Sequence, residues 1–387
     1  MSALDKLKNE QPRYAVLDAL RFVLALWVTI GHFETFPLFA GVNEATPAGR
    51  FVVHAWQTIV FGTPAVIVFF VISGFCIHLP YRAERKMDVG RFYLRRYTRI
   101  LIPVAAAVSV YRLVGQRFVL WGEHSILWQS PLWSLLCEEI YYAVYPLLRR
   151  LRRAASWQIV IPVAFAISAA VAATNVRALS WHEFGPLGTA AILLPVWLLG
   201  CLLAEEADAL PALRVDARWH IWGWRFTAWF ASWLTEMLHF KAHVPVTQTM
   251  AWFGLIAYIW VKNEIAWSKT RAPGRVLAWA GLWSYSLYLV HAHAGGLWYW
   301  PRTYWLSGVS VGPRLNWLMV ILSSLVGAYV FYLMVERPSH RLARWIGSAR
   351  KTMVLSGANG DSARAGDNAA TVLEPAPEAV TINATTI

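Results

Sequence analysis

The sequence predicts an all-α, polytopic integral membrane protein with about ten transmembrane helices and with its N- and C-termini in the cytoplasm. The 387 residues are 57% hydrophobic and only 15% charged, and the mean hydropathy is +0.43, which is too apolar for a soluble domain. Long apolar runs recur along the chain, each close to the ~20 residues that a helix needs to cross a bilayer. Basic residues gather in the segments between these runs.

Ten apolar runs are candidate spans. In chain order they cover residues 16–36, 58–79, 100–120, 131–148, 157–175, 187–204, 219–238, 247–261, 277–297 and 316–335. Arg112 and Arg117 interrupt the third run, and Arg225 and five tryptophans interrupt the seventh, so these two runs predict a span least strongly.

The basic residues predict the orientation of these spans. If the N-terminus lies inside, the inner segments hold 25 lysines and arginines and the outer segments hold six. This bias is the one that cytoplasmic loops show in membrane proteins. The net charge of +13 would also suit a nucleic-acid-binding protein. Because the charge follows the loops between spans, we expect a lipid bilayer as the partner and no nucleic acid.

The chain divides into two parts by composition. Residues 1–350 hold all the apolar runs and form the predicted membrane domain. Residues 351–387 are rich in alanine, glycine, threonine and asparagine, with scattered acids and little apolar periodicity. Such a composition buries too little apolar surface to fold, so it predicts a disordered cytoplasmic tail.

The first span carries three ionisable side chains, Asp18, Arg21 and His32. A charge at bilayer depth costs roughly 2.5–3.5 kcal/mol, so these groups are expected to have a use. Arg21 and His32 are eleven residues apart, which is about three helical turns and places both on one face. Asp18 is three residues before Arg21 and is expected to pair with it. The alternative is a buried helix with a hydrogen-bonded core histidine.

Polar groups in the second span and in the segment before the third span permit two interpretations each. Ser73 and Gly74 lie in an apolar run, and taken alone they favour close packing between helices. Arg95, Arg96 and Arg99 share a helical surface beside aromatic residues. They form either a topology signal on a cytoplasmic loop or a patch that binds phosphate groups.

The fourth span begins with a pair of adjacent carboxylates, Glu138 and Glu139. Ser134 lies four residues before Glu138, and Tyr141 and Tyr142 lie three and four residues after it. These hydroxyls are expected to hold Glu138 on an inward face. Two carboxylates inside an apolar helix are hard to explain by structure alone, so the pattern favours a functional role.

The last two spans add histidines and a carboxylate. His291 and His293 form a His-x-His pair, but helical residues two apart face different ways and no third ligand is evident, so no metal site is expected. The tenth span ends in Glu336-Arg-Pro338, where the proline is expected to stop the helix.

Together these motifs resemble acyltransferase family 3, a family of integral membrane O-acyltransferases that includes acetyltransferases of surface polysaccharides, nodulation factors and macrolides. The matching elements, in the order of the family, are Arg21 with His32, residues 69–75, residues 95–103, residues 133–138, residues 285–291 and residues 336–338. The chain departs from the family pattern by one extra residue before Pro103 and by His293, where the family often has proline.

The resemblance implies transfer of an acyl group, usually acetyl from acetyl-CoA, to a hydroxyl of a saccharide acceptor, in a bacterial inner membrane. No bound cofactor is implied, because acyl-CoA is a co-substrate. His32 is the implied catalytic residue, with Arg21 and Glu138 beside it in the reaction. The residues expected to bind acyl-CoA or acceptor are Ser73, Arg95, Arg96, Arg99, Trp133, Ser134, Tyr288, His291 and Glu336.

This chemistry suits the side chains, because acyl transfer to a hydroxyl needs a base and a group that stabilises the oxyanion. Histidine changes charge near neutral pH, and a carboxylate can fix its tautomer. In the ten-span arrangement His32, Glu138 and His291 lie at similar depth in the outer half, and the arginines lie at the inner side. This arrangement predicts a cytoplasmic acyl-CoA site and an outward acceptor site.

Two other classes of protein remain as alternatives. A proton-coupled secondary transporter also places ionisable groups inside the membrane, but it predicts internal repeats and paired broken helices, which the sequence does not show. A non-catalytic subunit of a polysaccharide export assembly would leave Arg21, His32 and Glu138 unexplained. The oligomeric state is not predicted.

Overall fold

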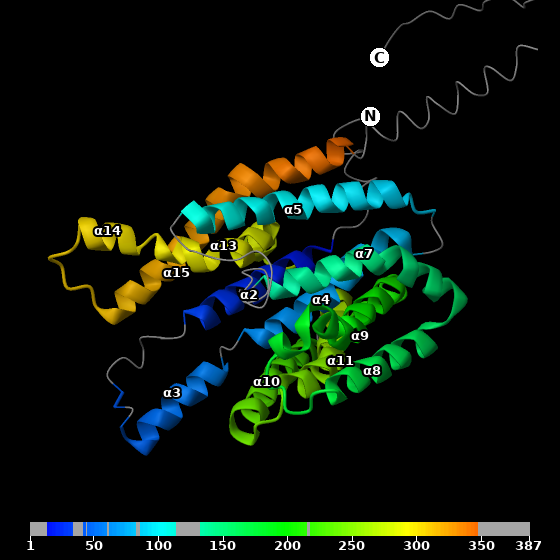
Figure 1. Ribbon diagram of the computed structural model, residues 1–387, viewed down its shortest axis with the longest axis horizontal. Coiled ribbons are helices and arrows are strands. Elements are labelled where there is room, and N and C mark those ends of the chain that lie inside the picture. The colour runs from blue at the N-terminus through cyan, green and yellow to red at the C-terminus, as the bar shows by residue number, and fades with distance from the viewer. Residues whose placement is uncertain are drawn as a thin grey trace, which may run out of the picture.

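The computed structural model describes residues 14–33, 42–43, 45–59, 62–82, 86–113, 132–214 and 217–346, and it contains helices but no strand in these ranges. Most of the long helices lie side by side with their axes roughly aligned (Figure 1). The predicted tail, 351–387, lies outside the described residues.

The helical elements are described here by their bounds. They are α2 (Ala15–His32), α3 (Pro47–Ile59), α4 (Thr63–His78), α5 (Val89–Leu113), α7 (Trp133–Ala154), α8 (Trp157–Ala173), α9 (Gly185–Glu206), α10 (Arg218–Ala242), α11 (Val246–Ser268), α12 (Arg275–Ala280), α13 (Ser284–Gly296), α14 (Tyr299–Tyr304) and α15 (Pro313–Phe331), with 3-10 turns at Leu79–Tyr81, Trp181–Phe184 and Gly281–Trp283 and a π-helical turn at Tyr332–Glu336. Each predicted span coincides with one of these helices over its described residues, the ninth with α12 and α13 together. Helices α3 and α14 were not predicted.

Among the described residues, four helical segments are long and apolar enough to cross a membrane. They are Ala15–His32, Thr63–Tyr81, Gly185–Glu206 and Pro313–Ile346. These segments support a membrane protein. The total of ten spans and the cytoplasmic position of both ends stay predictions.

Helix α4 lies at the centre of the bundle and packs against α9, α11 and α2. Its residues are apolar on every side, and nearly all of them are buried, as expected for a helix without a polar face. The backbones of α4 and α9 touch at two glycines. A Cβ on Gly74 would lie 2.0 Å from the carbonyl oxygen of Trp197, and a Cβ on Gly200 would lie 2.0 Å from that of Val71. The close packing predicted at Gly74 is confirmed.

A break in the ninth predicted span brings α2 close to its neighbours. The 3-10 turn Gly281–Trp283 separates α12 from α13. A Cβ on Gly281 would lie 2.1 Å from the carbonyl oxygen of Asp18, so only glycine allows this approach of the two backbones. The first span is therefore held against the break at the level of Asp18 and Arg21.

The prediction that Pro338 ends the tenth helix is wrong. The helix continues to Ile346, because the π-helical turn Tyr332–Glu336 precedes the proline. In this turn the N–H of Arg337 bonds the carbonyl oxygen of Tyr332, five residues back. The wider turn makes room for the proline ring, which lacks an N–H and clashes with the preceding turn of a regular α-helix.

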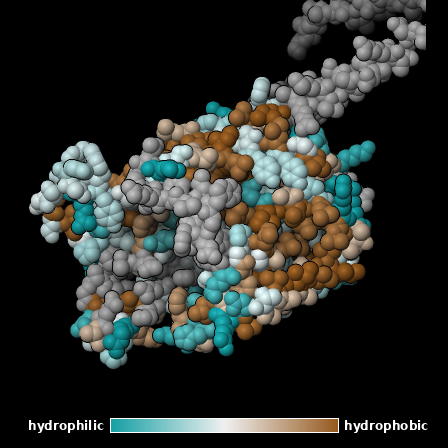
Figure 2. All heavy atoms as spheres, in the orientation of Figure 1, coloured by the Kyte–Doolittle hydropathy of each residue, from teal (hydrophilic) through white to brown (hydrophobic). Residues whose placement is uncertain are grey.

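The surface over α7 and α8 is largely hydrophobic, as Figure 2 shows in brown. Leu147 on α7 is 66% exposed, and Ile159 and Val163 on α8 are 58% and 51% exposed. An exposed apolar face of this kind is expected where lipid surrounds the helices.

Candidate active site

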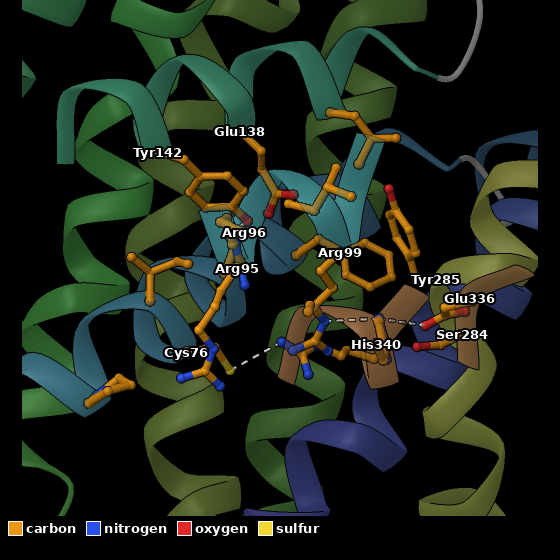
Figure 3. A pocket seen from close by; sticks show the side chains of 18 of the residues that line it. Cys76, Arg95, Arg96, Arg99, Glu138, Tyr142, Ser284, Tyr285, Glu336 and His340 are labelled. Atoms are coloured by element: carbon orange, nitrogen blue, oxygen red, sulfur yellow. Dashed lines mark hydrogen bonds and ion pairs between the residues drawn. The ribbon is translucent and has the colours of Figure 1, made fainter. Parts of the chain in front are cut away.

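A cavity of about 1050 Å³ opens between α2, α4, α5, α7, α13 and the extension of α15 (Figure 3). It is at least as large as the roughly 300–1,000 Å³ pockets that hold drug-sized ligands. Nine of the twelve predicted site residues line it, and these are Arg21, Ser73, Arg95, Arg96, Arg99, Ser134, Glu138, Tyr288 and Glu336. The structure therefore brings together residues that are up to 315 positions apart in the sequence.

The cavity is strongly cationic. Nine basic side chains line it, against four carboxylates: Arg21, Lys86, Arg91, Arg95, Arg96, Arg99, Arg337, Arg341 and Arg344, with Asp18, Asp88, Glu138 and Glu336. Helix α5 begins at Val89, so the arginine motif is a helical surface facing the cavity and not a loop. A cavity with this charge suits a ligand with several negative charges.

Arg96 and Glu138 meet at one wall of the cavity. The Arg96 guanidinium lies 4.2 Å from the centroid of the Tyr142 ring. The hydroxyls of Tyr142 and Ser73 are 2.9 Å apart, and Glu138 lies beside both of them and faces Arg96. Of the hydroxyls expected to hold Glu138, Tyr142 does so, whereas the Tyr141 hydroxyl donates to the Ala190 carbonyl.

Arg21 is held at the second wall by two contacts. Its Nη1 lies 3.5 Å from the Asp18 carboxylate, so the predicted ion pair is confirmed. Its Nη2 donates to the Cys76 sulfur at 3.1 Å. These contacts direct the guanidinium into the cavity, at the same face as Glu138.

A chain of polar contacts fixes Arg99 at the third wall (Figure 3). The Arg99 Nε–H donates to His340 Nε2 at 2.9 Å, and this nitrogen lies 3.6 Å from the Glu336 carboxylate. The other oxygen of Glu336 accepts from the Ser286 hydroxyl at 2.5 Å and from the Ser286 N–H at 3.2 Å. Glu336 is buried, and the π-helical turn that ends at this residue helps to turn its side chain inward.

At another point of the cavity the hydroxyls of Ser134 and Tyr288 are 2.6 Å apart. Ser134 was expected to support Glu138, and it bonds Tyr288 of α13 instead. Tyr288 lies between the cavity and His291, because the centroids of the Tyr288 and His291 rings are 6.4 Å apart. A path of contacts thus connects the cavity to the two histidines.

His32 and His291 form a pair next to the cavity and do not line it. His291 Nδ1 lies 2.9 Å from the Tyr288 carbonyl oxygen and 3.1 Å from that of Leu287. Carbonyl oxygens only accept, so this nitrogen carries the hydrogen, and Nε2 of neutral His291 is an acceptor. His32 Nδ1 lies 3.3 Å from His291 Nε2 and 2.8 Å from the Val28 carbonyl oxygen.

These distances assign the tautomer of His32. Its Nδ1 faces two acceptors and must carry the hydrogen, so the lone pair of the neutral ring is on Nε2. His32 is exposed, whereas His291 is 1% exposed. The contacts of the His32 ring are thus with Val28 and His291, and not with the Glu138 carboxylate that was expected to orient it.

One predicted site residue lies outside the cavity, and two residues that line the cavity were not predicted. Trp133 packs against Phe70 and stacks on Trp181, with ring centroids 5.8 Å apart in the stack, and does not line the cavity. His340 and Tyr285 line it and were not predicted. The sequence could have predicted His340 as a site residue, because it lies four residues after Glu336 and therefore on the same helical face.

Some polar atoms of the cavity lining are buried and lack a partner. Within the part of the chain that the structure describes, Arg91 Nε, Arg96 Nε and the Tyr285 hydroxyl have no hydrogen-bond partner. Buried polar atoms of this kind are rare in folded proteins and call for a ligand or water. The described residues contain no group of three His, Cys, Asp or Glu side chains that could hold a metal ion.

A family model described as "Acyltransferase domain" matches residues 14–333, which is most of the chain and includes every helix from α2 to α15. No curated protein and no solved structure matches the chain. The matched segment contains the histidine pair and the cavity residues of α2, α4, α5, α7 and α13, whereas Glu336 and His340 of the third wall follow it. On this match and on the motifs that line the cavity, the chain belongs to acyltransferase family 3.

Proposed function

We propose that this membrane acyltransferase transfers an acyl group, usually acetyl, from acyl-CoA to a hydroxyl of a saccharide. The acceptor is a glycan or a lipid-linked glycan. The observation that carries the proposal is the cationic cavity, in which buried donors of Arg91 and Arg96 have no partner among the described residues. Tyr288 and His291 connect this cavity to His32, whose Nε2 has a lone pair.

The cavity is proposed to bind the CoA part of the donor. CoA carries a diphosphate and a 3′-phosphate, and arginine binds such groups through forked, charge-assisted hydrogen bonds. Arg96 and Arg99 are held in place by Tyr142 and His340, so little side-chain freedom is lost when phosphate binds. Glu138 lies among these groups, and we assign it to the ordering of Arg96 rather than to the ordering of His32.

The thioester is proposed to lie at the Ser134 and Tyr288 hydroxyls. These are the cavity groups that lead toward the histidine pair. A hydroxyl there can donate to the carbonyl oxygen as negative charge develops on it, which is the largest single contribution in many acyl transfers.

His32 is proposed as the general base. Its Nε2 takes the proton of the acceptor hydroxyl while the hydroxyl oxygen attacks the thioester carbonyl carbon. The tetrahedral intermediate collapses with cleavage of the C–S bond, and the proton passes from Nε2 to the CoA thiolate. The products are the ester and free CoA, and His32 returns to its starting state. His291 holds the Nδ1–H of His32 throughout, so we assign it to positioning.

The location follows from the same proposal. Acyl-CoA is made in the cytoplasm, so the cationic end of the bundle faces inward and His32 lies toward the outer side of a bacterial inner membrane. This orientation agrees with the excess of basic residues on the predicted inner segments.

Purified protein in lipid nanodiscs, mixed with radiolabelled acetyl-CoA and a panel of saccharides, tests the proposal. We expect label in a saccharide ester and release of free thiol in equal amounts. A transporter would move a solute without forming the ester, and a non-catalytic subunit would do neither. Absence of thiol release with every acyl-CoA tested would contradict the proposed reaction.

A further inference from the structure

Tyr285 of α13 lines the cavity, but the proposed reaction gives it no role. Its hydroxyl is buried and has no hydrogen-bond partner among the residues that the structure describes. Buried polar atoms of folded proteins are nearly always paired with protein, water or a ligand. The hydroxyl therefore offers a hydrogen bond to a molecule that occupies this part of the cavity.

Helix α13 places Tyr285 between the two ends of the proposed donor site. Tyr288 follows three residues later, on the same helical face and roughly 4.5 Å further along the axis, and its hydroxyl marks the proposed position of the thioester. Ser286, the next residue in the chain, bonds Glu336 of the network that fixes Arg99. A donor that reaches from Arg99 to Tyr288 is therefore expected to pass Tyr285.

The direction of the Tyr285 side chain keeps its hydroxyl out of the third wall. In Figure 3 the hydroxyl points away from Ser284 and from the Glu336 carboxylate. The carboxylates of Glu139, Glu336 and Glu138 are near enough to interact with it electrostatically. A phosphate group is unfavourable beside carboxylates, whereas a neutral hydrogen-bonding group is not. The surroundings of Tyr285 thus favour a neutral polar part of the donor over its phosphates.

CoA has such a part between its phosphates and its sulfur. The pantetheine arm carries secondary amides, each with an N–H that donates and a carbonyl oxygen that accepts. A tyrosine hydroxyl can bond either group, because it both donates and accepts. We infer that Tyr285 binds an amide of the pantetheine arm and so aligns the thioester with Ser134 and Tyr288. The inference rests on the proposed function for the choice of CoA as the donor.

Calorimetry in lipid nanodiscs with two probes tests this inference. CoA contains the pantetheine arm, and adenosine 3′,5′-bisphosphate contains the nucleotide without the arm. The proteins are the wild type, Tyr285→Phe and the control Tyr304→Phe. Phenylalanine keeps the ring and removes only the hydroxyl. Tyr304 is an exposed tyrosine on α14 that does not line the cavity.

We expect Tyr285→Phe to weaken CoA binding roughly three- to tenfold, as the loss of one neutral hydrogen bond predicts. Its affinity for adenosine 3′,5′-bisphosphate should stay within about twofold of the wild type, and Tyr304→Phe should bind both probes normally. The Tm of ligand-free Tyr285→Phe should not fall, because the hydroxyl has no protein partner to lose. A lower Tm with unchanged affinities would mean that the hydroxyl is only structural and would overturn the inference.

Two other results would also overturn it. Unchanged binding of CoA by Tyr285→Phe would show that the hydroxyl does not contact the donor, and equal weakening of both probes would place the hydroxyl at the nucleotide. Neither result contradicts acyl transfer. Because binding is measured without turnover, a wild type that binds CoA and forms no ester would contradict the proposed function and not the role of Tyr285 in binding CoA.

Discussion

His32 is the residue on which the proposed chemistry depends most directly. We expect His32→Ala to lower the rate of acyl transfer at least about a hundredfold, because loss of a general base typically costs 10²–10⁴-fold. Membrane insertion and thermal stability should not change, since the ring is exposed. His220→Ala is the control, because His220 is an exposed histidine on α10 that bonds Asn263 away from the cavity. A His32→Ala enzyme with more than about a tenth of the normal rate would exclude His32 as the base.

The role of His291 is tested by shape-conserving variants. His291→Phe removes the Nε2 that accepts from His32 Nδ1 and leaves the Val28 carbonyl oxygen as its acceptor, so the orientation of the His32 ring is less constrained. We expect kcat to fall roughly tenfold or more while the KM for acyl-CoA stays within about twofold. His291→Gln retains an acceptor and should recover part of the rate. A raised KM with normal kcat would instead support the direct substrate-binding role that the sequence predicted.

Arg96 and Arg99 test the donor site. We expect Arg96→Ala or Arg99→Ala to raise the KM for acyl-CoA roughly tenfold, since each charge-assisted hydrogen bond contributes about 1.5–3 kcal/mol and 1.4 kcal/mol is a factor of ten. Arg96→Lys and Arg99→Lys should have a KM for acyl-CoA almost as high as the alanine variants, because lysine keeps the charge and loses the forked geometry. The acceptor KM should stay nearly constant. Arg150→Ala is the matched control, and unchanged donor kinetics in all variants would leave these arginines as a topology signal.

The residue types of the site were predictable, but their contacts were not. Asp18 and Arg21 are three residues apart on one helix, so their ion pair followed from helical spacing alone. The contact of Ser134 with Tyr288 joins residues 154 positions apart, and no local pattern predicts it. Glu138 was expected to lie beside His32 from a depth estimate along each helix. Depth does not say which way a side chain points, and the structure turns Glu138 toward Arg96.

At the scale of elements, the glycine contact between α4 and α9 gives a stability prediction. Gly200→Ala places a Cβ about 2.0 Å from the Val71 carbonyl oxygen, and overpacking of this kind typically costs 1–3 kcal/mol. Gly223→Ala in α10 meets nothing within 4 Å and should be neutral or slightly stabilising, because alanine favours the helix. Thermal unfolding in detergent should therefore show a lower Tm for Gly200→Ala only. Equal Tm values would mean that the two helices separate without difficulty.

The long helices were accessible from the sequence because an apolar run of about twenty residues is a strong signal. The short helices α3 and α14 fall below that length and were missed. Pro338 misled the prediction because proline usually ends a helix, and the wide turn before it leaves no mark in composition. The third span was predicted from residue 100, and the helix begins eleven residues earlier, at Val89, so the arginine motif lies on this helix.

For the whole molecule, the ten-span prediction is tested by reporter fusions. Fusions after Arg150 and Thr270 should report a cytoplasmic position, and fusions after Glu44 and Trp305 should report an external one. The reason is the excess of basic residues on one set of connecting segments. An alkaline phosphatase signal at Arg150 would reverse the assignment of the donor side.

The backbone contact of α4 with α9 also bears on how a donor enters and leaves. Two helices that touch through glycines have no side chains between them to repack, so sliding one along the other would drive a neighbouring Cβ into a carbonyl oxygen. The wall that carries Ser73 and Cys76 is therefore a fixed frame. For the proposed acyl-CoA donor, we therefore expect entry and exit to involve movement of another wall, such as α5 with its arginines, rather than sliding of α4 on α9.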